Sequence, residues 1–250
     1  MMIKTQQRPV AIVTGASSGI GLTIAQHLSK AGYDLALCAR RHDRLTDVAK
    51  GLEANGSAVL TQAVDLREEA QILSFFEAVD QRFGRIDVLV NNAGLGHKES
   101  LMSGNTDAWR EMLEVNVLAL CICTREAVQR MISANSGHIV HISSMSGHRV
   151  PAITGVYSAT KFAVRSLGET LRRELRAAQS NIRISSVSPG VVETEFAQKY
   201  HQSAEKAQET YGQFPVLQSE DIAKAVIYAL QQPAHVEVND ILIRPTQQVS

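Results

Sequence analysis

Short apolar runs alternate with longer amphipathic segments along most of the chain. The apolar runs predict seven strands, at 10–15, 33–40, 57–65, 86–94, 137–144, 182–190 and 240–245. These runs are nearly continuous in Val, Ile, Leu and Ala, which is typical of strands buried on both faces of a parallel sheet. The segments between them predict helices at 19–31, 42–54, 67–83, 105–133, 155–179 and 219–231. This alternation predicts an α/β fold: a doubly wound parallel sheet of about seven strands in three α/β/α layers.

One stretch interrupts the regular order. Residues 191–218 are polar, contain Gly212 and Pro215, and are too long for a tight connection. Long insertions in compact domains are often lids over a site, although a plain surface excursion fits this composition equally well. We expect a single domain over 1–250, with 191–218 as a substrate-loop insertion.

The first predicted strand runs into a glycine-rich turn, TGASSGIG at 14–21. Such a turn lets the backbone approach a pyrophosphate, and the N-terminus of the following helix favours its negative charge. The spacing G-x₃-G-x-G is neither G-x-G-x-x-G nor a P-loop. Glycines also serve tight bends alone. At the first strand-to-helix turn of a doubly wound sheet, however, the motif favours dinucleotide binding through Gly15, Ser17, Ser18, Gly19, Ile20 and Gly21.

Two arginines follow the second predicted strand. Arg40 and Arg41 stand where NAD-binding folds usually carry an acidic residue for the ribose hydroxyls. A guanidinium pair suits a ribose 2′-phosphate instead. The alternative is a solvated charge pair at a helix start, but the helix macrodipole does not favour arginine there. We therefore expect NADP(H) to be preferred over NAD(H).

Two more strand ends supply polar groups to the same edge of the sheet. Asp65, followed by Leu66, ends the third strand. Its carboxylate either accepts a hydrogen bond from the adenine amino group or caps a helix starting near Arg67. The sequence NNAG at 91–94 ends the fourth strand. Asn-Ala-Gly is ordinary turn chemistry, but its position predicts that Asn92, Ala93 and Gly94 line the cofactor trough.

Tyr157 and Lys161 lie one turn apart in VYSATKFAV, so they share a face of the predicted helix. A free tyrosine has a pKa of about 10, and a nearby cation lowers such a pKa by roughly 1–3 units. Lys161 is such a cation, and an oxidised nicotinamide would add a second positive charge. The pair is therefore expected to exchange protons with a substrate near neutral pH.

Ser144 and Asn116 extend this candidate site. Ser144 ends the fifth strand, and the parallel strand order places its hydroxyl beside Tyr157, where it can hold a substrate oxygen. Asn116 lies within a long apolar helix, where its amide needs partners, and a water between it and Lys161 would complete a proton path. Taken singly, each residue also has an ordinary structural explanation. Tyr157 and Lys161 could be a common helix pair, Ser144 a cap and Asn116 a structural amide. Their occurrence together in one fold indicates the chemistry.

Charge and cysteine spacing argue against other classes of protein. Lys+Arg and Asp+Glu both number 25, so no net charge attracts nucleic acid or an anionic membrane. Cys38, Cys121 and Cys123 show neither disulfide nor zinc spacing, and we expect reduced cysteines and no metal. With no apolar run of 18 residues and no signal-peptide pattern, a cytoplasmic location is expected.

Together, the motifs resemble the short-chain dehydrogenase/reductase family over residues 10–245. TGASSGIG, NNAG, Asn116, Ser144, YSATK (157–161) and SPGVVET (188–194) occur in the family's order. The resemblance implies a Rossmann-type fold and hydride transfer between NADP(H) and an alcohol or carbonyl substrate. It implies Tyr157 as general acid/base, Ser144 as carbonyl orienter, Lys161 as pKa tuner and nicotinamide-ribose ligand, and Asn116 as carrier of the water relay. It also implies a cofactor wall from Pro189, Gly190, Val191, Val192 and Thr194.

The tail at 233–249 resembles a subgroup of that family with arginine after the second strand. The arginine of that subgroup favours NADP(H). Members of the subgroup act on steroids, terpenoids and polar acids, so the resemblance selects no substrate. The family also implies a homotetramer or homodimer assembled through the helices at 105–133 and 155–179. We expect pocket walls from 94–101, 145–155 and 191–215, whose residues Leu95, Leu101, Val150, Ile153 and Phe196 favour a partly apolar small molecule.

Two other functions compete with that of a reductase. A nucleotide-sugar epimerase usually needs a larger C-terminal substrate domain, for which this chain has no room. A catalytically silent NADP(H) sensor or scaffold would be expected to lack Tyr157, Lys161 or Ser144, all of which are present. His148 and Trp109 are expected to be structural rather than to touch substrate.

Overall fold

The computed structural model describes residues 7–151 and 154–249. Within these residues, seven parallel strands form one sheet in the order β3-β2-β1-β4-β5-β6-β7. The strands are β1 Val10–Thr14, β2 Asp34–Ala39, β3 Val59–Ala63, β4 Val88–Asn91, β5 His138–Ile142, β6 Arg183–Pro189 and β7 Asp240–Ile243. Each predicted apolar run contains one of these strands, so the doubly wound parallel sheet is confirmed.

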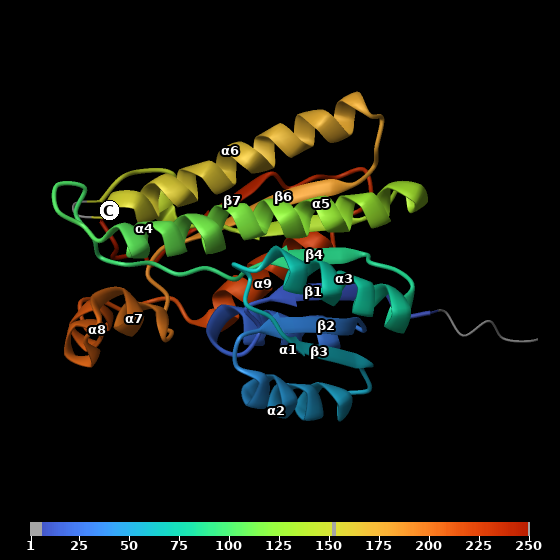
Figure 1. Cartoon of the computed structure of the whole chain (residues 1–250), viewed down its shortest axis with the longest axis horizontal. Helices are drawn as coiled ribbons and strands as arrows, with labels where there is room; N and C mark the ends of the chain where they lie inside the picture. Colours follow the sequence, from blue (N-terminus) through green and yellow to red (C-terminus); the bar gives the residue numbers. More distant parts are fainter. Residues whose placement is uncertain (1–6, 152–153, 250) are drawn as a thin grey trace, which may run out of the picture.

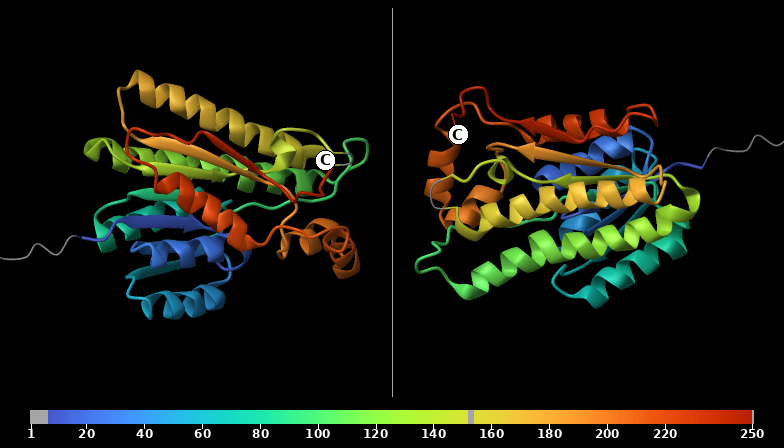
Figure 2. Two further views of the ribbon diagram at one scale, coloured as in Figure 1. Left: turned by 180° about the vertical axis from the view of Figure 1, so that it is seen from behind. Right: turned by 90° about the horizontal axis from the view of Figure 1, so that it is seen from above.

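Helices cover both faces of the sheet, which gives the Rossmann-type three-layer arrangement (Figures 1 and 2). One face carries α1 Gly19–Lys30, α2 His42–Glu53 and α9 Ser219–Leu230. The other carries α3 Glu69–Phe83, α5 Ala119–Met131 and α6 Gly155–Ala177. Each layer buries its own apolar cluster against the sheet, which explains why the strands read as nearly continuous apolar runs.

The strand order reverses between β1 and β4. β1 pairs with β2 on one side and with β4 on the other, and the chain crosses from β3 to β4 to reach that position. In doubly wound sheets a crevice opens at the carboxyl ends of the strands beside such a reversal. All five residues of β1 are buried, so this crevice has a rigid floor.

The helix predicted over 105–133 differs from the structure. It is built from α4 Thr106–Leu113, a π-helical turn η1 Glu114–Leu118, and α5. The π turn contains Asn116, whose side chain bonds across to neighbouring segments. Single π turns inside α-helices mark places where the regular ladder yields to such a side-chain requirement.

Residues 191–218 contain two short helices, α7 Phe196–His201 and α8 Ala204–Tyr211. Figure 1 shows both helices beyond the carboxyl ends of the strands, away from the two helix layers. Tyr211 Oη at the end of α8 donates to the Thr194 carbonyl at 2.7 Å and accepts from the Ala197 amide at 3.3 Å. These bonds hold α8 against the start of α7. Among the described helices, none is long and apolar enough to cross a membrane.

We expect Gly21→Ala to lower the free energy of unfolding by about 1–3 kcal/mol, the usual cost of overpacking. A Cβ at Gly21 would lie 2.4 Å from Asn92 Nδ2 and 2.6 Å from the Gly15 carbonyl oxygen. Urea denaturation measures the change. Gly51→Ala in α2 is the matched control, because nothing lies within 4 Å of its Cβ position, and it should stabilise the helix slightly. A Gly21→Ala protein as stable as wild type would contradict this close packing.

Candidate active site

A cleft of about 550 Å³ opens at the carboxyl ends of the strands, beside the reversal of strand order. Its walls come from the glycine turn, the ends of β2 to β6, the first turn of α6, and the segment that carries α7. Nearly all residues predicted to bind the cofactor or act in catalysis line it: Gly15, Ser17, Ser18, Gly19, Ile20, Gly21, Arg40, Arg41, Asp65, Leu66, Asn92, Ala93, Gly94, Ser144, Tyr157, Lys161, Pro189, Gly190, Val192 and Thr194. The described residues contain no cluster of His, Cys, Asp or Glu able to hold a metal ion.

The glycine turn is held open by the end of β4. Asn92 Nδ2 donates to the Thr14 carbonyl at 2.8 Å and to the Gly15 carbonyl at 3.3 Å. Gly15 has φ +68°, and a Cβ there would lie 2.9 Å from Ala93 Cα. Because Asn92 bonds the carbonyl side of the turn, its side chain serves mainly to position the turn that faces the cleft.

The two arginines after β2 point in different directions. Arg41 Nη2 donates to Ser18 Oγ at 2.6 Å and to Ser17 Oγ at 3.1 Å, so its guanidinium lies on the glycine turn. Arg40 is exposed, and its Nη1 lies 3.5 Å from Glu111 in α4. Both arginines line the cleft, but only Arg41 contacts the glycine turn.

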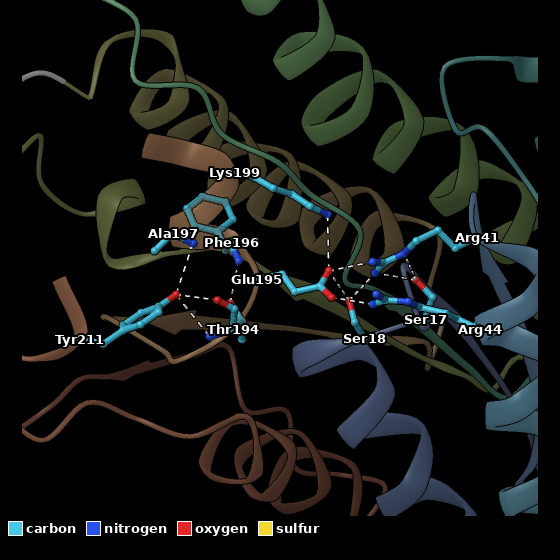
Figure 3. Close-up of polar contacts among 10 residues, drawn as sticks. All are labelled: Ser17, Ser18, Arg41, Arg44, Thr194, Glu195, Phe196, Ala197, Lys199 and Tyr211. Atoms are coloured by element: carbon cyan, nitrogen blue, oxygen red, sulfur yellow. Dashed lines mark hydrogen bonds and ion pairs between the residues drawn. The ribbon is translucent and has the colours of Figure 1, made fainter. Parts of the chain in front are cut away.

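Glu195 also lines this end of the cleft and pairs with Arg44, and the sequence alone did not single out either residue. Glu195 Oε2 accepts from Arg41 Nη1 at 2.8 Å, and its Oε1 accepts from Arg44 Nη1 at 2.5 Å. Figure 3 shows the carboxylate pointing between the two guanidinium groups. The only signal in the sequence was Arg44 one turn after Arg40; nothing marked Glu195 as its partner.

Asp65 is paired within its own loop. Its carboxylate accepts from the Arg67 amide at 3.1 Å and forms an ion pair with the Arg67 guanidinium at 2.5 Å, and these contacts lower the pKa of Asp65. It is not an N-cap, because α3 starts at Glu69 and its capping position is Glu68. The alternative of a capping role is therefore wrong, and Asp65 lines the cleft as the partner of Arg67.

Tyr157 lies in the first turn of α6, with only 9% of its surface exposed. Burial raises the pKa of Tyr157 to about 12, and a hydrogen bond with Ser144 counters part of that rise. Ser144 caps the short 3₁₀ turn η3 Met145–Gly147 by accepting from the Ser146 amide at 3.1 Å. The two hydroxyls therefore meet at the end of β5, as the parallel strand order predicts.

Lys161 lies below Tyr157 and is fully enclosed. Its Nζ donates to the Ile142 carbonyl at 3.0 Å and lies 5.9 Å from the centre of the Tyr157 ring. Burial lowers the pKa of Lys161 to about 8. Without a nucleotide, the loss of hydration raises the pKa of Tyr157 more than the Ser144 hydrogen bond lowers it. That Lys161 and an oxidised nicotinamide together bring the phenol near neutrality stays a prediction.

The side-chain amide of Asn116 is hydrogen-bonded to the loop after β4. Its Oδ1 accepts from the Leu95 amide at 2.9 Å, and its Nδ2 donates to the Leu95 carbonyl at 2.8 Å and to Thr160 Oγ1 at 3.1 Å. Asn116 Oδ1 and Lys161 Nζ would both lie 3.4 Å from a Cβ at Gly94. Asn116 is thus a neighbour of Lys161, but its side chain is occupied by these described partners rather than aimed at the lysine.

An aromatic group from the predicted wall 191–215 covers Tyr157, and of its two residues the sequence singled out only Phe196. The Phe196 ring centre lies 5.4 Å from that of Tyr157, and Tyr200 stacks on Phe196 at 5.8 Å. Leu101 and Val150, expected in the pocket walls, are instead 71% and 68% exposed and do not line the cleft. Leu95 does line it, and Ile153 lies outside the described residues.

His148 and Trp109 do not line the cleft, as expected. His148 Nε2 lies 3.5 Å from Asp240 in β7. Trp109 packs beside Gly104, where an added Cβ would lie 2.8 Å from the indole ring. All three cysteines are free thiols, and Cys38 and Cys123 are buried as small apolar groups.

We expect Lys161→Met to be more stable than wild type at pH 7 and to lose that advantage by about 3 kcal/mol as the pH approaches 10.5. Below pH 8 the folded protein carries a buried ammonium. Between pH 8 and 10.5 the unfolded chain holds a proton that the folded chain has released, so wild-type stability rises with pH in that window.

Denaturation of both proteins without added nucleotide, at several pH values, measures this difference. Lys224→Met, an exposed position in α9 with 66% of its side chain accessible, is the control and should show no such trend. A stability difference between Lys161→Met and wild type that does not depend on pH would contradict a buried, titrating lysine.

Comparison with known proteins agrees with this geometry. The short chain dehydrogenase family model matches residues 9–205. Human dehydrogenase/reductase SDR family member 11 is 48% identical over 248 residues, covering 96% of this chain and 95% of its own. The closed form of serine dehydrogenase complexed with NADP⁺ superposes with a TM-score of 0.91, at 31% identity and 96% coverage of both chains. A short chain dehydrogenase/reductase from Burkholderia phymatum in complex with NAD has a TM-score of 0.86 at 27% identity, covering 96% of this chain and 90% of its own. From the motif order, the sheet and these relatives together, the chain belongs to the short-chain dehydrogenase/reductase family of oxidoreductases.

Proposed function

We propose that the protein is an NADP(H)-dependent carbonyl reductase and alcohol dehydrogenase. It interconverts a secondary or primary alcohol and its ketone or aldehyde by hydride transfer, with Tyr157 as general acid/base. The observation that carries this proposal is the enclosed group at the start of α6: the Tyr157 hydroxyl bonded to Ser144, with Lys161 Nζ 5.9 Å from the phenol ring.

The residues of the cleft fit a dinucleotide. The glycine turn offers no side chain at Gly15 or Gly21, where a Cβ would strike neighbouring atoms. Arg41 and the two serine hydroxyls of that turn gather hydrogen-bond donors at one end of the cleft, while Tyr157 and Lys161 stand at the other. The residues proposed to hold the cofactor are Gly15, Ser17, Ser18, Gly19, Ile20, Gly21, Arg40, Arg41, Asp65, Leu66, Asn92, Ala93, Gly94, Tyr157, Lys161, Pro189, Gly190, Val192 and Thr194.

When bound, the nicotinamide supplies or accepts the hydride. Tyr157 Oη donates its proton to the carbonyl oxygen during reduction and removes it during oxidation. Ser144 Oγ holds the same oxygen and fixes its distance from the phenol. The Lys161 ammonium stabilises the phenolate that forms after proton donation, and a dry pocket strengthens that stabilisation.

Without a nucleotide, burial keeps Tyr157 in its protonated form, which is the form that donates during reduction. A phenol with a pKa of about 12 is protonated at neutral pH, and a protonated phenol is the form that donates. Oxidation requires the phenolate, which the protein's own groups disfavour. Positive charge beside the phenol would lower its pKa and make the reverse reaction accessible.

The substrate proposed is a small, partly apolar alcohol or carbonyl compound. Phe196 and Tyr200 present ring faces beside Tyr157, and Leu95 and Val192 line the same cleft. Such walls favour burial of apolar surface around the reacting oxygen. A dimer or tetramer through α5 and α6 also remains our proposal: Leu118 and Phe162 expose 55% and 39% of their surfaces beside these helices, and light scattering tests it.

Replacing Tyr157 by Phe should reduce turnover by about 10²–10⁴-fold, the usual loss for a missing general acid/base. NADPH oxidation with a panel of ketones and aldehydes measures the change, and NADPH titration should show that cofactor binding survives. Tyr228→Phe, at an exposed tyrosine of α9, is the matched control. Wild-type turnover in Tyr157→Phe would refute the catalytic assignment. Cofactor binding by wild type without turnover on any carbonyl would favour a dinucleotide sensor or scaffold instead.

Replacing Arg41 by Ala should weaken NADPH binding by about 10–100-fold and leave NADH binding nearly unchanged. This range corresponds to the loss of charge-assisted hydrogen bonds to the 2′-phosphate. Fluorescence titration of both cofactors gives the two dissociation constants. Arg110→Ala, an exposed arginine of α4 paired with Asp107, is the control. Equal weakening of NADPH and NADH would contradict the 2′-phosphate assignment of Arg41.

A further inference from the structure

A carboxylate from a distant segment lies among the arginines of the cleft. Glu195 accepts from Arg41 Nη1 at 2.8 Å and from Arg44 Nη1 at 2.5 Å, although these residues are 154 and 151 positions away in the chain. Ser18 Oγ lies 3.4 Å and Lys199 Nζ 3.6 Å from the same carboxylate (Figure 3). Glu195 therefore joins the segment that carries α7 to the glycine turn and to the start of α2.

This cluster has the chemistry of an oxyanion site. Two guanidinium groups and a serine hydroxyl converge on one pair of carboxylate oxygens. Arginine forks bind carboxylates and phosphates with the same geometry, and a phosphate monoester offers a third acceptor oxygen and more negative charge. The carboxylate thus fills the kind of site in which a 2′-phosphate would be received.

Glu195 is held by ion pairs that can be exchanged. The side chains of Arg41, Arg44 and Glu195 are 35%, 51% and 37% exposed, and ion pairs this open to water contribute little to stability. The hydrogen bonds from Arg44 and Arg41 lower the pKa of Glu195 to about 2. The competing group is therefore fully charged at any pH at which the protein would be assayed.

We propose that Glu195 is a cofactor-specificity residue, an internal anion that competes with the ribose 2′-phosphate for Arg41 and Arg44. This inference rests on the NADP(H) preference proposed above. A nucleotide with the 2′-phosphate replaces the carboxylate with a stronger anion. A nucleotide without it brings nothing to that site, and the ion pairs of Glu195 remain.

The exchange also reaches the catalytic end of the cleft. Glu195 directly precedes Phe196, whose ring packs on Tyr157. The Glu195 backbone carbonyl accepts from the Lys199 amide at 3.3 Å. Release of the carboxylate from the arginines removes one tether from the first turn of α7, which carries the aromatic cover over Tyr157 and stays bonded to Tyr211. Binding of the phosphate group would thus loosen residues 194–201 beside Tyr157.

The test uses 2′,5′-ADP and 5′-AMP as probes, titrated against the full-length chain by calorimetry. Glu195→Gln should bind 2′,5′-ADP about 3–30-fold more tightly than wild type does, which corresponds to the removal of two weak competing ion pairs. Its affinity for 5′-AMP should change by much less. Glu193→Gln is the matched control: it removes an equal charge two residues away, from an exposed side chain that accepts from Gln218 Nε2.

A second measurement on wild type needs no variant. Amide hydrogen exchange at 194–201 should become faster when 2′,5′-ADP is added and stay unchanged with 5′-AMP. Unchanged or slower exchange with 2′,5′-ADP overturns the proposal, since it would mean that Glu195 keeps its ion pairs with Arg41 and Arg44 when the nucleotide is bound.

The outcomes separate this inference from the proposal on which it rests. If wild type binds 2′,5′-ADP no more tightly than 5′-AMP, the NADP(H) preference itself fails. If wild type prefers 2′,5′-ADP and loses that preference in Arg41→Ala, but Glu195→Gln binds it no better than wild type, only the role of Glu195 is overturned. Tightening in Glu193→Gln equal to that in Glu195→Gln also overturns it, because the effect would then be one of net charge.

Discussion

The amide of Asn92 bonds the carbonyls of Thr14 and Gly15, and the rest of the site depends on that contact. It ties the end of β4 to the glycine turn at the place where the strand order reverses. The turn can approach β4 so closely only because Gly15 and Gly21 lack a Cβ. The backbone that faces the cleft is thereby positioned by the sheet.

Dehydration governs the catalytic end of the cleft. Tyr157 and Lys161 are both buried, and the loss of hydration drives their pKa values toward the neutral forms, the phenol upward to about 12 and the ammonium downward to about 8. The two pKa values therefore move apart from nearly equal ordinary values, and the neutral phenol forms no ion pair with the lysine. Such a pair can exchange a proton with a substrate oxygen and respond to any additional charge placed beside it.

The opposite end of the cleft is governed by charge in contact with water. Arg41, Arg44 and Glu195 form an open cluster whose ion pairs are individually weak. The segment that carries α7 links the two ends, since Glu195 contacts the arginines and Phe196, the next residue, contacts Tyr157. The two contacts are therefore made by adjacent residues of one segment.

The sequence by itself determined the sheet, its strands and most residues of the cleft. Period and composition mark buried strands because a parallel sheet covered on both faces requires apolar residues at nearly every position. Local spacing likewise places Tyr157 and Lys161 on one face of α6, and strand ends such as Ser144 at one edge of the sheet. These are properties of residues close together in the chain, so the sequence alone reveals them.

Only the tertiary structure decided which charges and rings meet. The division of Arg40 from Arg41, the reach of Glu195 across more than 150 residues to Arg41 and Arg44, and the stacking of Tyr200 and Phe196 beside Tyr157 depend on how the segment 191–218 folds over the sheet. Burial raises the pKa of Tyr157, whereas a nearby lysine would lower it. Burial also depends on how the whole chain packs. Local pattern specifies which faces are apolar, but the distances between segments far apart in the chain, and the water excluded between them, arise only when those faces pack together.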